Sequence, residues 1–303
     1  MCGIVGLFAK TREFECALGA HLAQMLMQMT ERGPDSAGFA VYRDDVGAGA
    51  AKVTVMLPGG DFDTGSLEAA MTERFGAGAG LVVRATHAVL TVPADAKEVL
   101  AWLQRTHSEL YVTSSGSVIE IYKETGLPKK VVSLFGLDSM TASHALGHTR
   151  MATESAVTSR ASHPFSTGLD VCLVHNGSLS NHNRLRENLR DEGIRFGTDN
   201  DSEVAAGYLQ WRMSRGDDLD DALNHVLEDL DGFYTFAIGT RDGFAVLRDP
   251  IGCKPAVMAE TDDWVAMATE FRAIATLPGV DNARLSEPEP GRVYTWERGR
   301  CDA

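Results

Sequence analysis

The sequence lacks the features of membrane, secreted and metal-dependent proteins. No apolar run approaches the roughly 18 residues that a membrane-spanning helix needs. The opening MCGIVGLFAK has neither the basic segment nor the small-residue cleavage site of a signal peptide. The five cysteines lie far apart without a C-x-x-C pair, which fits reduced thiols better than a disulfide framework or a zinc site. We therefore expect a cytoplasmic protein with no membrane contact and no metal site of its own.

Signatures of nucleotide and nucleic-acid binding are also missing. There is no Walker A sequence, and the glycine stretch at 76–80 is followed by Leu81, so it lacks the third glycine of a dinucleotide fingerprint. Basic residues are outnumbered, with 28 Lys and Arg against 42 Asp and Glu and a net charge of −14. This balance argues against a nucleic-acid partner or an anionic membrane surface. It leaves room for a small anionic substrate held by a few local arginines.

What is present is an ordinary globular composition, with 44% hydrophobic and 23% charged residues in a chain of 303. This length allows two domains or one large domain. Apolar spacing predicts helices over 17–30, 181–190, 201–214 and 217–229. Short apolar or alternating runs predict strands over 3–8, 38–42, 144–150, 171–177, 232–239, 244–249, 256–260 and 264–269.

A middle region, about 59–143, has an element order of its own. We expect a strand over 81–86, a helix over 94–107, and strands over 109–113 and 117–122. The β-α-β-β order suggests a compact inserted α/β subdomain rather than a disordered linker. Its apolar residues could form a core of its own or dock a partner.

Cys2 is a candidate nucleophile. Removal of the initiator methionine would leave one residue that carries both a thiol and a free α-amine. The unperturbed pKa values of a thiol and an α-amine, about 8.5 and about 7.7–8.0, let the amine act as base for the thiol. The alternative is a small buried residue beside a strand.

A thiol that attacks an amide needs donors for the developing oxyanion. In the HNGSLSN segment at 175–181, Asn176 offers a side-chain amide and Gly177 an exposed backbone N–H. The alternative is an Asn-Gly turn at the end of a strand.

The charged ends of a substrate also need partners. Arg150 suits an α-carboxylate and is followed by Thr153, while Asp201 near a helix start suits an ammonium group. The alternatives are a surface ion pair for Arg150 and an N-cap role for Asp201, with Asp199 the better cap of the two.

Five ordered motifs carry a family resemblance: Cys2-Gly3-Ile4, RGPDSAG at 32–38, HTRMAT at 148–153, HNG at 175–177 and DSEV at 201–204. Together they resemble the class II glutamine amidotransferases of the N-terminal nucleophile hydrolase superfamily. Segments at 248–255, 268–280 and 289–294 resemble later parts of that domain, so the resemblance covers 1–303 outside the middle region. It implies an α+β fold, a four-layer αββα sandwich of two antiparallel sheets.

The resemblance also implies roles for single residues. Cys2 would be the nucleophile, with Asn176 and Gly177 as the oxyanion hole. Arg150, Thr153 and Asp201 would hold the α-carboxylate and α-amine of L-glutamine. The turn that contains Arg32, Gly33 and Asp35 would support Cys2. Many relatives have an aromatic residue at Met151 and some have histidine at Glu154, so the contacts above the glutamine differ in this chain.

The resemblance further implies glutamine hydrolysis to glutamate and ammonia through a Cys2 thioester. The sequence shows no region for an ammonia acceptor, so we expect that site on a partner subunit of a glutamate-synthase-type complex, such as N-methylglutamate synthase. FMN and iron–sulfur clusters would then belong to the partners, and this chain would carry no cofactor. One alternative is a non-hydrolytic structural or regulatory subunit whose retained Met1 blocks the amine, and another is an amidase that acts on a different amide.

Overall fold

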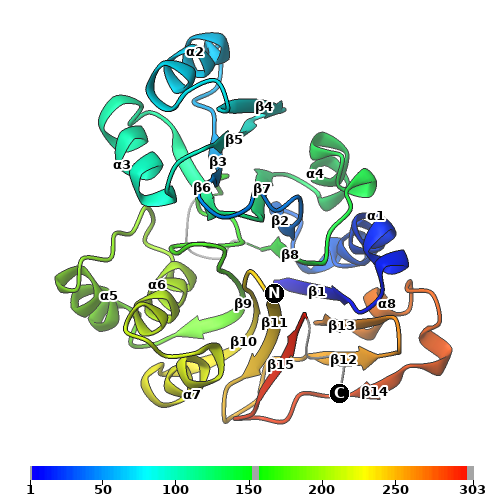
Figure 1. Ribbon diagram of the computed structural model, residues 1–303. Helices are drawn as coiled ribbons and strands as arrows, with labels where there is room; N and C mark the ends of the chain where they lie inside the picture. The colour runs from blue at the N-terminus through cyan, green and yellow to red at the C-terminus, as the bar shows by residue number, and fades with distance from the viewer. Residues whose placement is uncertain (1, 152–156, 299–303) are drawn as a thin grey trace.

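A large antiparallel sheet runs through the molecule (Figure 1). The computed structural model describes residues 2–151 and 157–298. Within them, seven strands pair in the order β14-β12-β13-β1-β8-β2-β7. Their bounds are β1 (Gly3–Ala9), β2 (Ser36–Tyr42), β7 (Ile119–Thr125), β8 (His144–Arg150), β12 (Val257–Glu260), β13 (Trp264–Ala268) and β14 (Arg284–Ser286). The chain enters this sheet at its third residue, as the apolar run at 3–8 predicts.

A second antiparallel sheet has the strand order β15-β11-β10-β9. Its strands are β9 (Cys172–Leu179), β10 (Gly232–Gly239), β11 (Gly243–Arg248) and β15 (Val293–Glu297). Apolar side chains of this sheet form a core with three helices: α5 (His182–Asp191), α6 (Asp201–Ser214) and α7 (Leu219–Asp229). The predicted bounds of α6 are confirmed, and those of α5 and α7 differ by one or two residues.

The side chains of β1 alternate between two cores, as the two-residue period of a strand requires. Val5 and Leu7 pack with Leu22 of helix α1 (Arg12–Gln28), near α8 (Phe271–Ile274). Ile4 packs instead with Val174 of the second sheet. Helix α1 thus covers one face of the large sheet, and the second sheet packs on the other. The observed fold is mixed α and β with several antiparallel sheets, as expected.

Helix α1 begins five residues before the predicted start at 17. The hydroxyl of Thr11 caps it by accepting a hydrogen bond from the N–H of Phe14. The first turn carries Glu13 and Glu15, which are favoured near the positive end of the helix dipole, and it places Phe14 in the core. The prediction began the apolar spacing at Leu18 and so missed this turn, although Phe14 lies four residues earlier and packs in the same core. Of the helices in the described ranges, none has the length and apolar character to cross a bilayer.

Part of the middle region forms a separate lobe, at the top of Figure 1. Its sheet has the order β4-β5-β3-β6 and packs with α2 and α3 around its own core, which contains Trp102 and Leu103. The bounds are β3 (Ala51–Met56), α2 (Thr64–Phe75), β4 (Gly80–Arg84), β5 (His87–Val92), α3 (Ala96–Thr106) and β6 (Tyr111–Gly116).

The observed lobe covers 51–116, whereas the expected subdomain was 59–143. Strand β7, predicted as part of the subdomain, pairs with β2 in the large sheet instead. Helix α4 (Pro128–Phe135) packs with α1 and the same sheet. Alternation alone identified a strand near 117–122 but could not identify its pairing partner, which is more than 75 residues away. That the lobe is an insertion relative to shorter relatives remains a prediction.

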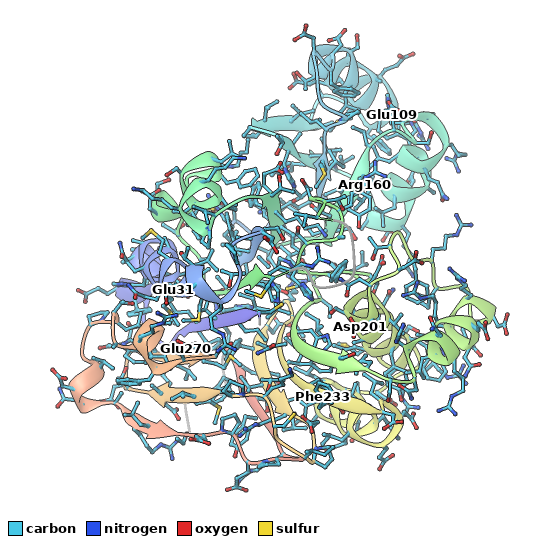
Figure 2. All side chains as sticks on the ribbon, turned by 180° about the vertical axis from the view of Figure 1, so that it is seen from behind. Glu31, Glu109, Arg160, Asp201, Phe233 and Glu270 are labelled. Atoms are coloured by element: carbon cyan, nitrogen blue, oxygen red, sulfur yellow. The ribbon has the colours of Figure 1, made fainter. Side chains whose placement is uncertain are left out.

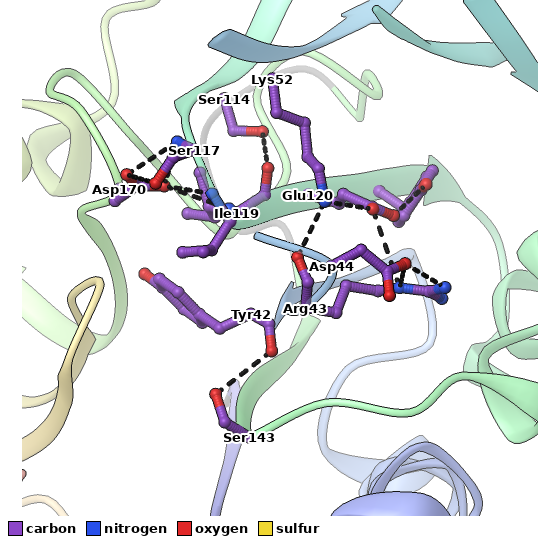
Figure 3. A network of polar contacts seen from close by, with 12 residues as sticks. Tyr42, Arg43, Asp44, Lys52, Ser114, Ser117, Ile119, Glu120, Ser143 and Asp170 are labelled. Carbon is purple, nitrogen blue, oxygen red and sulfur yellow. Dashed lines mark hydrogen bonds and ion pairs between the residues drawn. The ribbon is translucent and has the colours of Figure 1, made fainter. Parts of the chain in front are cut away.

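A buried ion pair joins the lobe to the large sheet (Figure 3). The ammonium of Lys52 on β3 donates to Glu120 on β7 at 3.1 Å and to the carbonyl of Arg43 at 2.8 Å. The hydroxyl of Tyr122 donates to the second oxygen of Glu120 at 2.7 Å. Removing one partner of such a pair typically costs about 3–5 kcal/mol because the other charge stays buried.

The turn from β6 to β7 is held by Asp170 (Figure 3). This buried carboxylate accepts the backbone N–H groups of Ser117, Val118 and Ile119 at 2.8–3.1 Å. Hydrogen bonds to an ionised acceptor are among the stronger ones in proteins. The lobe is therefore attached at two fixed points, β3 and the β6–β7 turn.

Buried histidines make the stability of this fold depend on pH. Burial lowers the pKa of His144 to about 3 and that of His87 to about 4. In the unfolded chain these rings have pKa values of about 6.5. Between these limits the unfolded chain binds more protons than the folded protein, so the free energy of unfolding falls as the pH falls below about 6.5. Each such histidine contributes a slope of about 1.4 kcal/mol per pH unit near pH 5.

We predict that His144→Gln lowers this slope by about 1.4 kcal/mol per pH unit. Urea unfolding at several pH values between 4.5 and 6 measures it. Phe8→Leu is the control, because Phe8 contacts the His144 ring without being ionisable. It should reduce stability by the same amount at every pH. An unchanged slope in His144→Gln would show that His144 takes up its proton without unfolding.

Candidate active site

Cys2 and Arg150 lie at the same edge of the large sheet. Gly3 of β1 pairs with Thr149 of β8, so the residues before Gly3 and after Thr149 are neighbours across the ladder. A Cβ on Gly3 would meet Met29, which places that face of β1 against α1. Alternation then puts Cys2 on the opposite face, toward the second sheet. Arg150 shares its face with His148, and its exposed fraction is 5%.

The backbone of Cys2 is held by an arginine. Nε of Arg32 donates to the carbonyl of Cys2 at 3.3 Å, and its Nη1 pairs with Glu270 at 2.9 Å. Two residues further on, Ile4 N–H donates to the hydroxyl of Thr269 at 2.8 Å. Arg32 therefore supports Cys2 through its main chain.

The turn at 33–35 packs directly on the end of β8. A Cβ on Gly33 would overlap with the backbone of Thr149 and Arg150, so glycine is required for this close approach. Asp35 N–H donates to the carbonyl of Arg150 at 3.1 Å. The structure thus places Arg32 against Cys2, and Gly33 and Asp35 against the end of β8 at Arg150.

Asn176 lies on β9 of the second sheet. Val174 faces the core between the two sheets, so alternation turns the Asn176 side chain the same way. Its exposed fraction is 3%, and its amide nitrogen has no hydrogen-bond partner within the described ranges. A buried donor without an acceptor is costly, commonly by about 1–3 kcal/mol. Such an orphaned donor is suited to an oxygen that a ligand supplies.

Gly177 cannot be replaced without strain. Its φ is 152°, and a Cβ there would overlap with the carbonyl oxygen of Phe233 on β10. The strand register pairs Gly177 with Tyr234. The close approach of β10 therefore requires a glycine after Asn176, which turn propensity alone did not indicate.

A hydrogen bond connects the two sheets at this edge. Nε2 of His148 lies 3.0 Å from the carbonyl oxygen of His175, the residue before Asn176. Burial lowers the pKa of His148 to about 3, so the ring is neutral at pH 7 and its Nε2–H donates. This bond connects β9 to β8 at a position two residues before Arg150.

Asp201 is the first residue of helix α6. Its Oδ2 accepts the backbone N–H of Leu179, at the end of β9, at 2.9 Å. We expected Asp199 to be a better N-cap than Asp201. The observed N-cap is Asn200, whose side chain accepts the N–H of Ser202. Asp199 is exposed and pairs with Arg186 at 2.9 Å. Figure 2 shows Glu270 on the β1 side and Asp201 on the β9 side, with Phe233 below them.

Strand pairing thus gathers Cys2, Arg150 and Asn176 on facing sides of the two sheets, with Asp201 next to β9. A thiol, an amide donor, a buried guanidinium and a carboxylate could together act on an amide whose other end carries a positive and a negative group. Thr153 lies outside the described residues. Sequence reasoning missed His148, His175, Thr269 and Glu270, although each falls within a quoted motif. Over 2–151 and 157–298, no group of three or more His, Cys, Asp or Glu residues could hold a metal ion.

We predict that Gly177→Ala destabilises the protein more than a matched substitution, Gly193→Ala. Gly193 also has a positive φ, 87°, but a Cβ there would meet open space. The control should cost about 1–2 kcal/mol from backbone strain alone. Gly177→Ala should cost about 3 kcal/mol or more because overlap adds to the strain. Urea unfolding measures both, and equal losses would show that β10 can move away from Gly177 freely.

Comparisons with known proteins identify the family. Residues 148–276, which include Arg150, Asn176 and Asp201, match the glutamine amidotransferase domain. The glutamine amidotransferase-like protein GlxB of Rhizobium meliloti (strain 1021) is 53% identical over 305 residues, which cover 99% of this chain and 100% of that protein. The amidophosphoribosyltransferase of Methanocaldococcus jannaschii is 30% identical over 190 residues, covering 62% of this chain and 40% of that protein.

A solved structure shares the fold. It is the glutamine phosphoribosylpyrophosphate amidotransferase from B. subtilis, complexed with ADP and GMP, with a TM-score of 0.60 and 20% identity. The similarity covers 98% of this chain and 47% of that one, so this chain spans about half the length of that enzyme. On the sequence relationship to GlxB and the shared fold, the chain belongs to the class II glutamine amidotransferases.

Proposed function

We propose that this chain hydrolyses L-glutamine, the substrate that its family implies, through a thioester on Cys2. The observation that carries the proposal is the buried amide nitrogen of Asn176, which has no hydrogen-bond partner among the described residues and lies on the side of its sheet that faces Cys2. A preorganised donor of this kind stabilises charge that develops only in the transition state.

In the proposed reaction, the α-amine of Cys2 is free once the preceding residue has been removed; Met1 lies outside the described residues. The amine takes the thiol proton, directly or through water, and the sulfur attacks the side-chain amide carbon. Asn176 and the N–H of Gly177 donate to the resulting oxyanion. The C–N bond then breaks and ammonia leaves with the transferred proton. Water attacks the thioester, releases glutamate and restores the thiol.

The charged groups at the other end of glutamine find partners on the two sheets. Arg150 would bind the α-carboxylate with its planar guanidinium, and Asp201 would bind the α-ammonium. Thr153 would add a contact to the same end. Arg150 is nearly fully buried, so its charge acts in a region of low dielectric constant, where ionic recognition is strong.

We infer that the layers follow the order helix, sheet, sheet, helix, the αββα sandwich expected for the superfamily. Three separate cores support this order. One lies between α1 and the large sheet, one between the two sheets, and one between the second sheet and helices α5 to α7. In this arrangement the site lies between the two sheets at one edge.

We further propose that the ammonia passes to a partner subunit of a glutamate-synthase-type complex in the cytoplasm, for example an N-methylglutamate synthase. FMN and iron–sulfur clusters would then be bound by the partner subunits. Support comes from chain lengths, because the match to GlxB covers that whole protein while the match to the longer amidophosphoribosyltransferase covers 40% of it. GlxB, which the match covers entirely, thus lacks what the longer enzyme adds to the shared region, and the proposal places the ammonia acceptor on another polypeptide.

We predict that Cys2→Ala abolishes glutaminase activity and that a glutamine-like electrophile labels Cys2 alone. Cys16 and Cys253 are exposed and serve as internal controls, since a general thiol reagent should label both. Asn176→Ala should lower kcat by about 10²–10³, the usual loss for one oxyanion donor. Asn183→Ala on the exposed side of α5 is the matched control and should leave kcat unchanged.

Labelling of Cys253 with Cys2 untouched would refute the nucleophile, and an unchanged kcat in Asn176→Ala would remove that residue from the oxyanion hole. Binding of glutamine without turnover in the native protein would instead support the non-hydrolytic subunit. Intact-mass measurement then distinguishes a retained Met1, which blocks the amine, from a processed but inactive chain.

We predict that the lobe docks the partner through β4, an edge strand on which Val82 and Val83 are 56% and 47% exposed. Trp102 and Leu103 belong to the lobe core and are excluded from docking. Val82→Lys with Val83→Lys should abolish co-purification of partner subunits and leave glutaminase activity intact. Leu127→Lys, at an exposed site outside the lobe, is the control. Elution of the native protein free of other subunits would contradict the proposal.

A further inference from the structure

His175 occupies a buried position between β9 and helix α6. Its Nδ1 lies 2.8 Å from the hydroxyl oxygen of Ser202, in the first turn of α6. The edge of its ring packs against Phe236 of β10, with the ring centroids 4.9 Å apart. The side chain is 3% exposed and its Nε2 has no hydrogen-bond partner within the described ranges. The ring is therefore fixed by packing and by the polar contacts of Nδ1, which also lies 3.8 Å from Oδ1 of Asp201.

These contacts assign the proton on the ring. Burial lowers the pKa of His175, against the opposing effect of Asp201, so the ring is neutral at pH 7. Within the described ranges Nε2 has no partner in either tautomer, but a proton on Nε2 would require the Ser202 hydroxyl to donate to Nδ1 and would deprive Oδ1 of Asp201 of that donor. The proton therefore belongs on Nδ1, which donates to the Ser202 oxygen. The Ser202 hydroxyl is then free to donate to Oδ1 of Asp201, 3.3 Å away.

The chain of hydrogen bonds ends on a carboxylate that is held at both oxygens. Oδ1 of Asp201 receives the Ser202 hydroxyl, and Oδ2 receives Leu179 N–H at 2.9 Å. With both oxygens engaged, the plane of the carboxylate is set by β9 and by the His175–Ser202 contact together. Loss of the contact would leave one oxygen free to rotate.

The main chain of the same residue connects to the other half of the site. The carbonyl of His175 accepts Nε2–H of His148, and the next residue is Asn176. His175 is thus joined to the large sheet through its backbone and to Asp201 through its side chain. Neither connection places it against a substrate.

We propose that His175 is a positioning residue that orients the Asp201 carboxylate, through Ser202, to bind the α-ammonium group of glutamine. The proposal rests on the proposed function, in which Asp201 binds that group. Because this role concerns recognition of an amine, loss of the His175 hydrogen bond should lower the affinity only for ligands that carry an amine.

Two substitutions separate the hydrogen bond from the packing. His175→Phe keeps a ring against Phe236 and removes the donor. His175→Asn keeps a donor in the position of Nδ1 and removes the ring. Both are made in the full chain with Cys2→Ala, so that binding is measured without turnover. Calorimetry gives Kd for L-glutamine and for glutaramate, which is glutamine without its α-amine, and circular dichroism verifies the fold.

We expect His175→Phe to raise Kd for glutamine about tenfold, the effect of one hydrogen bond to a charged group. Its Kd for glutaramate should change less than twofold. His175→Asn should retain most of the affinity for glutamine. Ser202→Ala should reproduce His175→Phe, and the double variant should add nothing further, because both remove the same connection.

Equal weakening of both ligands in His175→Phe would overturn the proposal, since it would indicate a purely structural role. Unchanged affinity for glutamine would overturn it as well. Failure of the proposed function has a different signature: the Cys2→Ala parent binds no glutamine, or Asp201→Asn weakens glutamine and glutaramate equally. In that case the His175 proposal falls with it.

Discussion

One hydrogen bond between the two sheets controls the geometry of the whole site. His148 on β8 donates to the carbonyl of His175 on β9, at the edge where both strands reach the candidate active-site residues. Each strand is held in register by its own neighbours, so fixing one pair of atoms fixes the residues that follow. Arg150 follows His148 by two positions, and Asn176 follows His175 by one. The bond lies in a region without water contact, where a lost hydrogen bond is costly.

This bond depends on a neutral ring. Burial keeps the pKa of His148 at about 3, and protonation would place an uncompensated charge between the sheets. Because these histidines are neutral, their rings add no positive charge near Arg150 and Asp201, the two charged groups proposed to bind the substrate. The two sheets can therefore present charges of opposite sign to the carboxylate and the ammonium group at one end of a small zwitterion. Preorganisation of this kind is what makes buried ionic recognition specific.

The sequence predicted local features well and non-local ones less well. The strand starting at Gly3 and helix α6 from Asp201 follow from apolar spacing and cap chemistry. The N-cap of α6 did not, because Thr198, Asp199, Asn200 and Asp201 can all cap and the choice depends on the contacts that the surrounding loop makes. Arg186 donates to the carbonyl of Asn200, and Glu203 accepts the N–H groups of Gly197 and Thr198. The pairing of β7 with β2 and the roles of His148 and His175 likewise depend on contacts far apart in the chain.

The lobe and the candidate oxyanion donor share an anchor. Asp170 fixes the turn between the lobe strand β6 and the sheet strand β7, and it lies two residues before β9, the strand of Asn176. The preceding segment is held by the buried Nζ of Lys123 on β7, which donates to the carbonyl of Ser162 at 2.9 Å. Because Asp170 bonds to the turn and β9 follows directly, a displacement of the lobe would act on the strand that carries Asn176. The buried Lys52–Glu120 pair resists such a displacement. A partner bound to the lobe would therefore be held at a fixed position relative to the site.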